Sequence, residues 1–226
     1  MIALGVICVV HGDFLWTWSG VPDGLPARAL FADATGLVLA AAGAGVLFDR
    51  TLRPAALVIA AIWAAFALCH VPGLVDNWRA YLGQLAEPSG LACLAAVLAG
   101  EYGRPRDQLA VAGRYGFGVC LVCYGVVHFL YPEAVADFIP SWIPGRLFLA
   151  YATGGAFVAT ALAVLSGVMM KLATRLLAVM FTSWVVLLHI PRVIAAPGDL
   201  HEWATLFIAL AFTGAAWIFA SSRATS

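Results

Sequence analysis

VPDGLPAR at residues 21–28 and IPSWIPGR at residues 139–146 are two copies of one segment, because both prolines and the closing arginine keep their places. The match extends outward in both directions. The other paired segments are Val9-Val10-His11 with Val126-Val127-His128, ATG at 34–36 with ATG at 152–154, and His70-Val71-Pro72 with His189-Ile190-Pro191 after a slip of one residue. A register kept across several hydrophobic segments is typical of an internal duplication. We therefore expect one structural unit to occur twice.

The composition predicts that most of the chain lies in lipid. Of the 226 residues, 63% are hydrophobic and only 11% are charged, and the mean hydropathy is +0.96, whereas about a quarter of the residues of a soluble domain are charged. A membrane-spanning helix needs about 20 mostly apolar residues. The apolar runs are continuous, unlike the alternating strands of a membrane barrel. The sequence therefore predicts an all-α polytopic membrane protein with eight transmembrane helices, at about 2–18, 29–48, 54–71, 88–102, 115–130, 146–167, 172–190 and 202–221.

Each copy is predicted to form a four-helix bundle. Residues 1–102 are the first, residues 103–113 a cytoplasmic linker, and residues 114–226 the second. Because an even number of spans separates the copies, both enter the membrane from the same side, which predicts a pseudo-twofold axis along the membrane normal. The first helix begins without a basic flank or a cleavage site for a signal peptide. We expect a genuine but short first span, or a start further upstream.

Basic residues set the expected orientation, since they gather in cytoplasmic loops. One side of the predicted topology carries Arg50, Arg53, Arg104, Arg106, Arg114, Lys171, Arg175 and Arg223, and the other carries Arg28, Arg79, Arg146 and Arg192. The excess of basic residues on the first side predicts that both termini are cytoplasmic. We expect the protein to be integral to the cell (inner) membrane.

All five histidines fall toward the outer ends of the predicted helices. The first copy carries His11, Arg28 and His70, and the second carries His128, Arg146 and His189. A histidine at a helix end can simply sit among lipid headgroups. Ionisable groups at membrane depth, however, are costly and tend to face the bundle interior or a water-filled cavity. Their recurrence in both copies favours a polar ligand pocket near the extracytoplasmic face.

The second copy is the richer of the two. It adds Arg192 and His201 to the recurring set. The first copy instead has Asp13, whose counterpart is Leu130, and Asp33, which we expect to pair with Arg28. Because Asp13 is not repeated, the residues do not define a metal site common to both copies.

Three chemistries fit the histidines and arginines. Facing imidazoles could bind a transition metal or both axial positions of a haem. Histidine with arginine could instead hydrogen-bond a quinone headgroup or an anion, or the residues could line a substrate path. The residues leave the cofactor undetermined: a quinone fits, and haem or a transition metal is a less favoured alternative.

Cys120 and Cys123 have the spacing of a redox dithiol, which would need an accessible thiolate of low pKa. Both fall inside an apolar run with no basic residue closer in sequence than Arg114 or His128, so we expect buried packing residues. The chain has no phosphate-binding glycine loop, no nucleophile elbow and no basic nucleic-acid face. No nucleic-acid partner is therefore expected.

Residues 114–221 resemble the DoxX-like membrane proteins, a family related to the membrane subunits of thiosulfate:quinone oxidoreductase. The resemblance rests on GVVHFLYP at residues 125–132, FIPSWIPG at residues 138–145, and Thr153-Gly154. The first copy resembles a diverged member that keeps His11, Pro22, Pro26, Thr35 and Gly36. The resemblance implies a four-helix bundle in each copy and an association with redox or quinone chemistry.

These observations favour a duplicated membrane protein linked to redox or quinone chemistry, with a redox partner subunit. Two other classes stay open: a membrane protein that binds or transports a small molecule or metal, and an accessory subunit without chemistry of its own. Whether the protein is an enzyme is left open.

Overall fold

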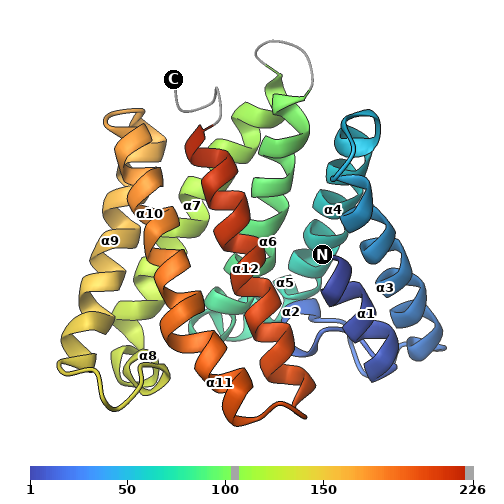
Figure 1. The fold of residues 1–226 in the computed structure, drawn as a ribbon, viewed down its shortest axis with the longest axis horizontal. Helices are drawn as coiled ribbons and strands as arrows, with labels where there is room; N and C mark the ends of the chain where they lie inside the picture. The colour runs from blue at the N-terminus through green and yellow to red at the C-terminus, as the bar shows by residue number, and fades with distance from the viewer. Residues whose placement is uncertain (103–106, 222–226) are drawn as a thin grey trace.

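The computed structural model describes residues 1–102 and 107–221 and contains helices but no strands within them (Figure 1). The elements are α1 (Ile2–His11), α2 (Trp16–Ser19), α3 (Arg28–Gly45), α4 (Asp49–Cys69), α5 (Val71–Asp76), α6 (Trp78–Glu101), α7 (Gln108–Leu130), α8 (Pro132–Phe138), α9 (Arg146–Ser166), α10 (Met170–Trp184), a π-helical turn η1 (Val185–His189), α11 (Ile190–Ala195) and α12 (Leu200–Ser221). The predicted all-α class is thus confirmed for the described residues.

Six helical segments are long and apolar enough to cross a membrane. They are Asp49–Asp76, Trp78–Glu101, Gln108–Leu130, Arg146–Ser166, Met170–Ala195 and Leu200–Ser221. Helix α1 has only 10 residues, and α3 has 18 residues that include Arg28 and Asp33. The chain is therefore a helical membrane protein with six candidate spans, and eight spans stay a prediction.

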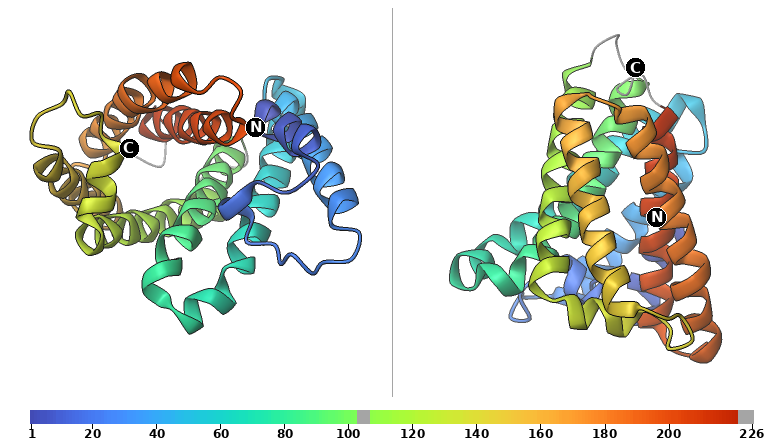
Figure 2. Two further views of the ribbon diagram at one scale, coloured as in Figure 1. Left: turned by 90° about the horizontal axis from the view of Figure 1, so that it is seen from below. Right: turned by 90° about the vertical axis from the view of Figure 1, so that its left-hand side faces the viewer.

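The two copies are joined through their last helices. Within the first copy α1 packs on α3, α3 on α4 and α4 on α6, and the second copy repeats this order with α7, α9, α10 and α12. Helix α6 then packs along α7, α12 contacts α1, and α6 contacts α12. Contact of α1 with α6, or of α7 with α12, is marginal at most. The halves lie at opposite ends of the long axis (Figure 2) and share α6 and α12 between them.

The first predicted helix was too long. Helix α1 ends at His11 because Gly12 adopts a left-handed conformation, with φ of 69°, and its N–H bonds the carbonyl of Cys8, which closes a helix C-terminus. The chain then turns inward through Phe14 and Leu15, which are buried, to the short helix α2. The segment that was predicted to continue the first span instead fills the first half with its own side chains.

The fourth predicted helix was too short. Helix α6 begins at Trp78, ten residues before the predicted start at Pro88, because the Asn77 side chain accepts a hydrogen bond from the N–H of Ala80 and caps it. Pro88 therefore lies inside the helix. Proline lacks the N–H that would bond the carbonyl of Gln84, four residues earlier. Two residues before Pro88, the carbonyl of Ala86 accepts a hydrogen bond of 3.2 Å from the Tyr124 hydroxyl, which ties α6 to α7.

The predicted linker at residues 103–113 was also too long, since α7 already begins at Gln108, capped by Asp107. Of the basic residues used for orientation, Arg104, Arg106 and Arg223 lie outside the described residues. The short helices α2, α8 and α11 lie at the lower end of the molecule in Figure 1, and the last described residues of α12 lie at the upper end.

Candidate functional site

Of two adjoining cavities, the inner one lies between the second half and α6, and the outer one lies within the second half; His128, Trp184 and His189 line both. The inner cavity has a volume of about 260 Å³ and is lined by Gly83, Glu87, Tyr124, Val127, His128, Phe157, Phe181, Trp184, His189, Thr205, Ile208, Ala209 and Phe212. The outer cavity, of about 200 Å³, is lined by His128, Val135, Phe138, Ile139, Thr153, Trp184, Leu188, His189 and Arg192. Three of the residues chosen from the sequence, His128, His189 and Arg192, therefore lie at one place.

The tautomer of His128 follows from its contacts. Its Nδ1 lies 2.8 Å from the carbonyl oxygen of Tyr124, one turn earlier in α7. Because a carbonyl can only accept, Nδ1 must donate, and in the neutral ring Nε2 is left with a free lone pair. The ring packs edge-on against Phe157, with centroids 5.1 Å apart. Gly154 of α9 lies directly against His128, since a methyl group added at Gly154 would be 2.8 Å from the His128 Cβ.

His189 ends the π-helical turn η1, two residues before Pro191 in α11. Single π-helical turns inside α-helices are frequent at functional sites. Its Nδ1 is buried and has no hydrogen-bond partner among the described residues. A buried polar atom without a partner costs stability. The unpartnered Nδ1 of His189 in a cavity wall therefore requires an explanation.

Arg192 has its charge balanced locally. Its Nε and Nη2 donate to the two carboxylate oxygens of Glu202 at 2.8 and 2.6 Å, and its guanidinium lies over the Phe138 ring, 5.2 Å from the centroid. A bidentate pair of this kind is strong and fixed in geometry. The ion pair ties α11 to α12 at the mouth of the outer cavity and leaves no unbalanced cation there.

Sequence reasoning missed Glu87 and Tyr124. Glu87 was excluded because the predicted helix began one residue after it, whereas the observed α6 carries it well inside the span and into the inner cavity. Its Oε2 accepts a hydrogen bond of 2.9 Å from the indole N–H of Trp18. The signal that could have found it was an acid next to a proline within a long apolar region.

Arg146 lies away from the two cavities, which corrects its predicted place beside His128 and His189. It lines a shallow depression with Glu133, Asp137 and four neighbouring residues at the α8–α9 connection. Although the segments around Arg146 and Arg28 match in sequence, the side chains have different surroundings. The reason is that Arg28 has Asp13 within reach, and the matching position in the second copy is Leu130.

Arg28 closes the loop of the first half. Its Nε donates to Asp13 at 2.7 Å, and its Nη1 donates to the carbonyls of Val21 and Pro22. Partial burial alone would raise the pKa of Asp13, but hydrogen bonds from the Phe14 N–H and from Arg28 outweigh it and hold the pKa below its usual value. Arg28 therefore has a structural role.

His11 and His201 both contact the Trp16 ring, and neither lines the two cavities. His11 stacks on Trp16 with centroids 4.4 Å apart, and His201 stacks on Trp18 at 5.4 Å and meets Trp16 edge-on at 5.2 Å. This stack joins α1 and α2 of the first half to the start of α12. The two imidazoles belong to the contact between the copies, and neither lines the cavities.

His70, the counterpart of His189, is 2% exposed and covered. The backbone of Gly20, with φ of 60°, lies directly on its ring, where an added methyl group would be 2.8 Å away. The ring of Tyr81 lies 6.4 Å from it. The first half thus closes over the histidine that the second half leaves in a cavity wall.

Two further predictions concern Asp33 and the cysteines. Asp33 does not pair with Arg28, which bonds Asp13 instead, and the Asp33 Oδ1 is buried without a hydrogen bond in the described part of the chain. The prediction of that pair was wrong.

All five cysteines are free thiols. Cys120 is buried and Cys123 is half-buried, as expected of packing residues.

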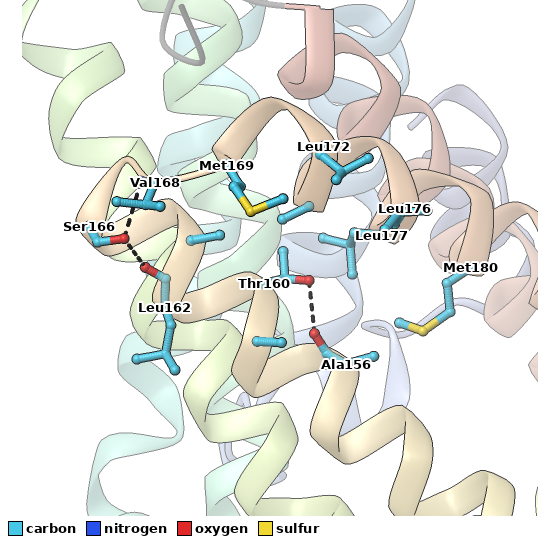
Figure 3. Close-up of a pocket in the computed structure, with 13 residues that line it drawn as sticks. Ala156, Thr160, Leu162, Ser166, Val168, Met169, Leu172, Leu176, Leu177 and Met180 are labelled. Atoms are coloured by element: carbon cyan, nitrogen blue, oxygen red, sulfur yellow. Dashed lines mark hydrogen bonds between the residues drawn. The ribbon is translucent and has the colours of Figure 1, made fainter.

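A larger groove of about 460 Å³ lies between α9 and α10 but offers little polar chemistry (Figure 3). Its two hydroxyl side chains, Thr160 and Ser166, already donate to the carbonyls of Ala156 and Leu162 in their own helix. The rest of the lining is apolar and includes exposed Leu162, Val168 and Met169. The groove fits a lipid-facing seam and is not the candidate site.

The fold and the cavities define a helical membrane protein with a small aromatic cavity that carries two histidines and a carboxyl group. Among the described residues, no group of three or more His, Cys, Asp or Glu side chains could hold a metal ion. No family model, curated protein or solved structure matches the chain.

Proposed function

We propose that this protein is a duplicated DoxX-like protein of the cell membrane, with both termini cytoplasmic, whose second half binds a quinone headgroup. It acts in quinone-linked redox chemistry together with a redox partner subunit. The observation that carries the proposal is that His128 and His189 line the same two aromatic cavities.

The two imidazoles offer complementary hydrogen bonds. His128 donates through Nδ1 to Tyr124, so its Nε2 accepts. Buried N–H groups without a partner are rarer than buried acceptors without one, so the buried Nδ1 of His189 favours the tautomer with the proton on Nε2. A quinone carbonyl oxygen accepts a hydrogen bond from such a donor, and the hydroxyl group of the reduced ring donates a hydrogen bond to such an acceptor. The pair suits both the oxidised and the reduced form of a quinone.

The walls suit a flat ring. Phe157, Phe181, Trp184 and Phe212 line the inner cavity, and their rings are arranged edge-on or tilted toward one another. The volume of about 260 Å³ lies just below the usual range of about 300–1,000 Å³ for small-molecule sites. A single substituted ring is therefore a better fit than a large macrocycle. The pairing of Arg192 with Glu202 also argues against an anionic ligand.

The test is quinone binding by the detergent-purified protein. Extraction of the purified protein is expected to yield quinone, and added decylubiquinone is expected to quench tryptophan fluorescence because Trp184 lines both cavities. Two lost hydrogen bonds cost about 1–3 kcal/mol together. The variant carrying His128→Ala and His189→Ala is therefore expected to bind about 5- to 150-fold more weakly.

The matched control is His11→Ala. His11 is the repeat counterpart of His128, but it stacks on Trp16 outside the cavities, so its loss is expected to leave quinone affinity unchanged. The proposal fails if the wild-type protein neither carries nor binds quinone. It also fails if the double variant, folded as judged by thermal unfolding, binds like the wild type.

A further inference from the structure

We infer that Glu87 recognises the quinone by donating a hydrogen bond from a neutral carboxyl group to a ring carbonyl oxygen. This inference rests on the proposed function and adds a ligand-binding residue to it. Glu87 lies on α6, which belongs to the first copy, whereas His128 and His189 lie on the second. The binding site is then built by both copies, which gives the duplication a role in binding.

The first step is the position of Glu87 in the membrane. It lies near the middle of a candidate span of 24 residues, Trp78–Glu101, and lines the inner cavity. Ionisable side chains inside membrane spans are rare and costly, and they mark ligand or proton sites by default. The other titratable side chains in the cavity wall are Tyr124, His128 and His189.

The second step is the charge state. Within residues 1–102 and 107–221, no basic side chain lies within 4.0 Å of the Glu87 carboxyl group. A lone carboxylate would have to be desolvated without compensation, which costs far more than burying the neutral acid. Apolar sites can hold a carboxylic acid neutral so that it donates a hydrogen bond. Glu87 is accordingly a donor in this cavity.

The third step is orientation. The indole N–H of Trp18 donates to Oε2 of Glu87 at 2.9 Å, so Oε2 is the carbonyl oxygen of the acid and Oε1 carries the proton. Trp18 is itself fixed, because it is 6% exposed and stacks on His201. A positioned donor loses less freedom when it binds than a mobile one. Trp18 is therefore a positioning residue for Glu87.

The experiment compares two substitutions at one position. Glu87→Leu removes both polar atoms at similar size, and quinone affinity is expected to fall about tenfold, as for one buried hydrogen bond. Glu87→Gln keeps a donor and an acceptor, and affinity is expected to stay within about threefold. Trp18→Phe removes the orienting bond together with part of the stack on His201, and its affinity is expected to fall between these values. Gln84→Leu, on the same helix but outside the cavity lining, is the control and is expected to bind like the wild type.

A vibrational measurement on the wild type makes the test independent of how well Glu87→Leu folds. Infrared difference spectra of decylubiquinone-loaded against quinone-free protein are expected to show a shifted C=O band of a protonated carboxyl group. That band is expected to be missing in Glu87→Gln.

The outcomes separate this inference from the proposed function. If the wild type binds no quinone, the proposed function fails. If the wild type binds quinone but Glu87→Leu binds equally well, or the carboxyl band does not respond to loading, only the role of Glu87 is overturned. Binding of tetraphenylphosphonium that is lost in Glu87→Gln would show an ionised carboxylate and would also overturn the inference.

Discussion

At the scale of single residues, matching sequence positions do not have matching surroundings. His70 and His189 share the His-x-Pro context, yet Gly20 covers His70 whereas His189 lies in a cavity wall. Arg28 and Arg146 each end a copy of the repeated segment, VPDGLPAR and IPSWIPGR, yet only Arg28 pairs with an aspartate of the preceding loop, Asp13. In both cases the difference comes from the loop after α1, which folds back into the first half.

The pairing of Arg28 with Asp13 predicts a pH-dependent stability. Asp13→Asn keeps an acceptor for the Phe14 N–H but removes the charge, and the side chain is 38% exposed, so we expect a loss of about 0.5–1 kcal/mol at pH 7. Because the pKa of Asp13 is lowered in the folded state, this contribution is complete above the ordinary carboxyl pKa of about 4. It is lost as the pH falls through the folded-state pKa.

Thermal unfolding of both proteins between pH 7 and pH 3 measures this effect, and the difference between them should shrink toward the acid end. Asp23→Asn is the control, since Asp23 is fully exposed and lies 3.6 Å from Arg28. An Asp13→Asn deficit that persists unchanged at pH 3 would contradict the assignment.

At the scale of elements, glycines set how closely helices approach. Gly36 of α3 lies against Gly5 and Cys8 of α1, whereas Gly154 of α9 lies against Gly125 and His128 of α7. In the sequence match Cys8 corresponds to Gly125, so the first helix of each copy is displaced by about one turn relative to its neighbour. That displacement leaves His11 exposed at the edge of the first half, whereas His128 lines the cavities of the second half.

Two adjacent glycines in α9 give a direct test. A methyl group at position 154 would be 2.8 Å from the His128 Cβ, whereas one at position 155 would meet nothing within 4 Å. We expect Gly154→Ala to destabilise the protein by about 1–3 kcal/mol through overpacking and to weaken quinone binding. Gly155→Ala should stabilise it by up to about 1 kcal/mol through helix propensity. Equal effects on thermal unfolding would show that α7 and α9 are not closely packed there.

At the scale of the whole molecule, α6 and α12 hold the copies together. Helix α6 packs between its own copy and α7, and Glu87 reaches from it into the cavity of the other copy. The aromatic stack of His11, Trp16, His201 and Trp18 joins the copies a second time. A single copy alone would lack one wall of the site.

The expected orientation can be tested by labelling single cysteines in a background without the five native ones. Leu47→Cys lies in the exposed turn between α3 and α4, and Gly198→Cys lies in the open turn before α12. The basic residues predict that position 47 is cytoplasmic and position 198 is external. In intact cells, a membrane-impermeant thiol reagent should therefore modify only the second. Modification of position 47 alone would show the opposite orientation, with position 47 external and position 198 cytoplasmic.

The sequence by itself determined the helical class and the membrane-like character of the helices, because composition and mean hydropathy are properties of the chain alone, and its repeated motifs predict a duplication. It also brought His128, His189 and Arg192 forward as candidates for one site. Only the tertiary structure decided that Arg146 and His201 lie elsewhere and that Glu87 joins the cavity. Glu87 joins the cavity because α6 begins ten residues before the predicted start and holds Pro88 inside the helix. Contacts of α6 with the distant residues Trp18 and Tyr124 accompany that placement, and the periodicity of the sequence does not predict such contacts.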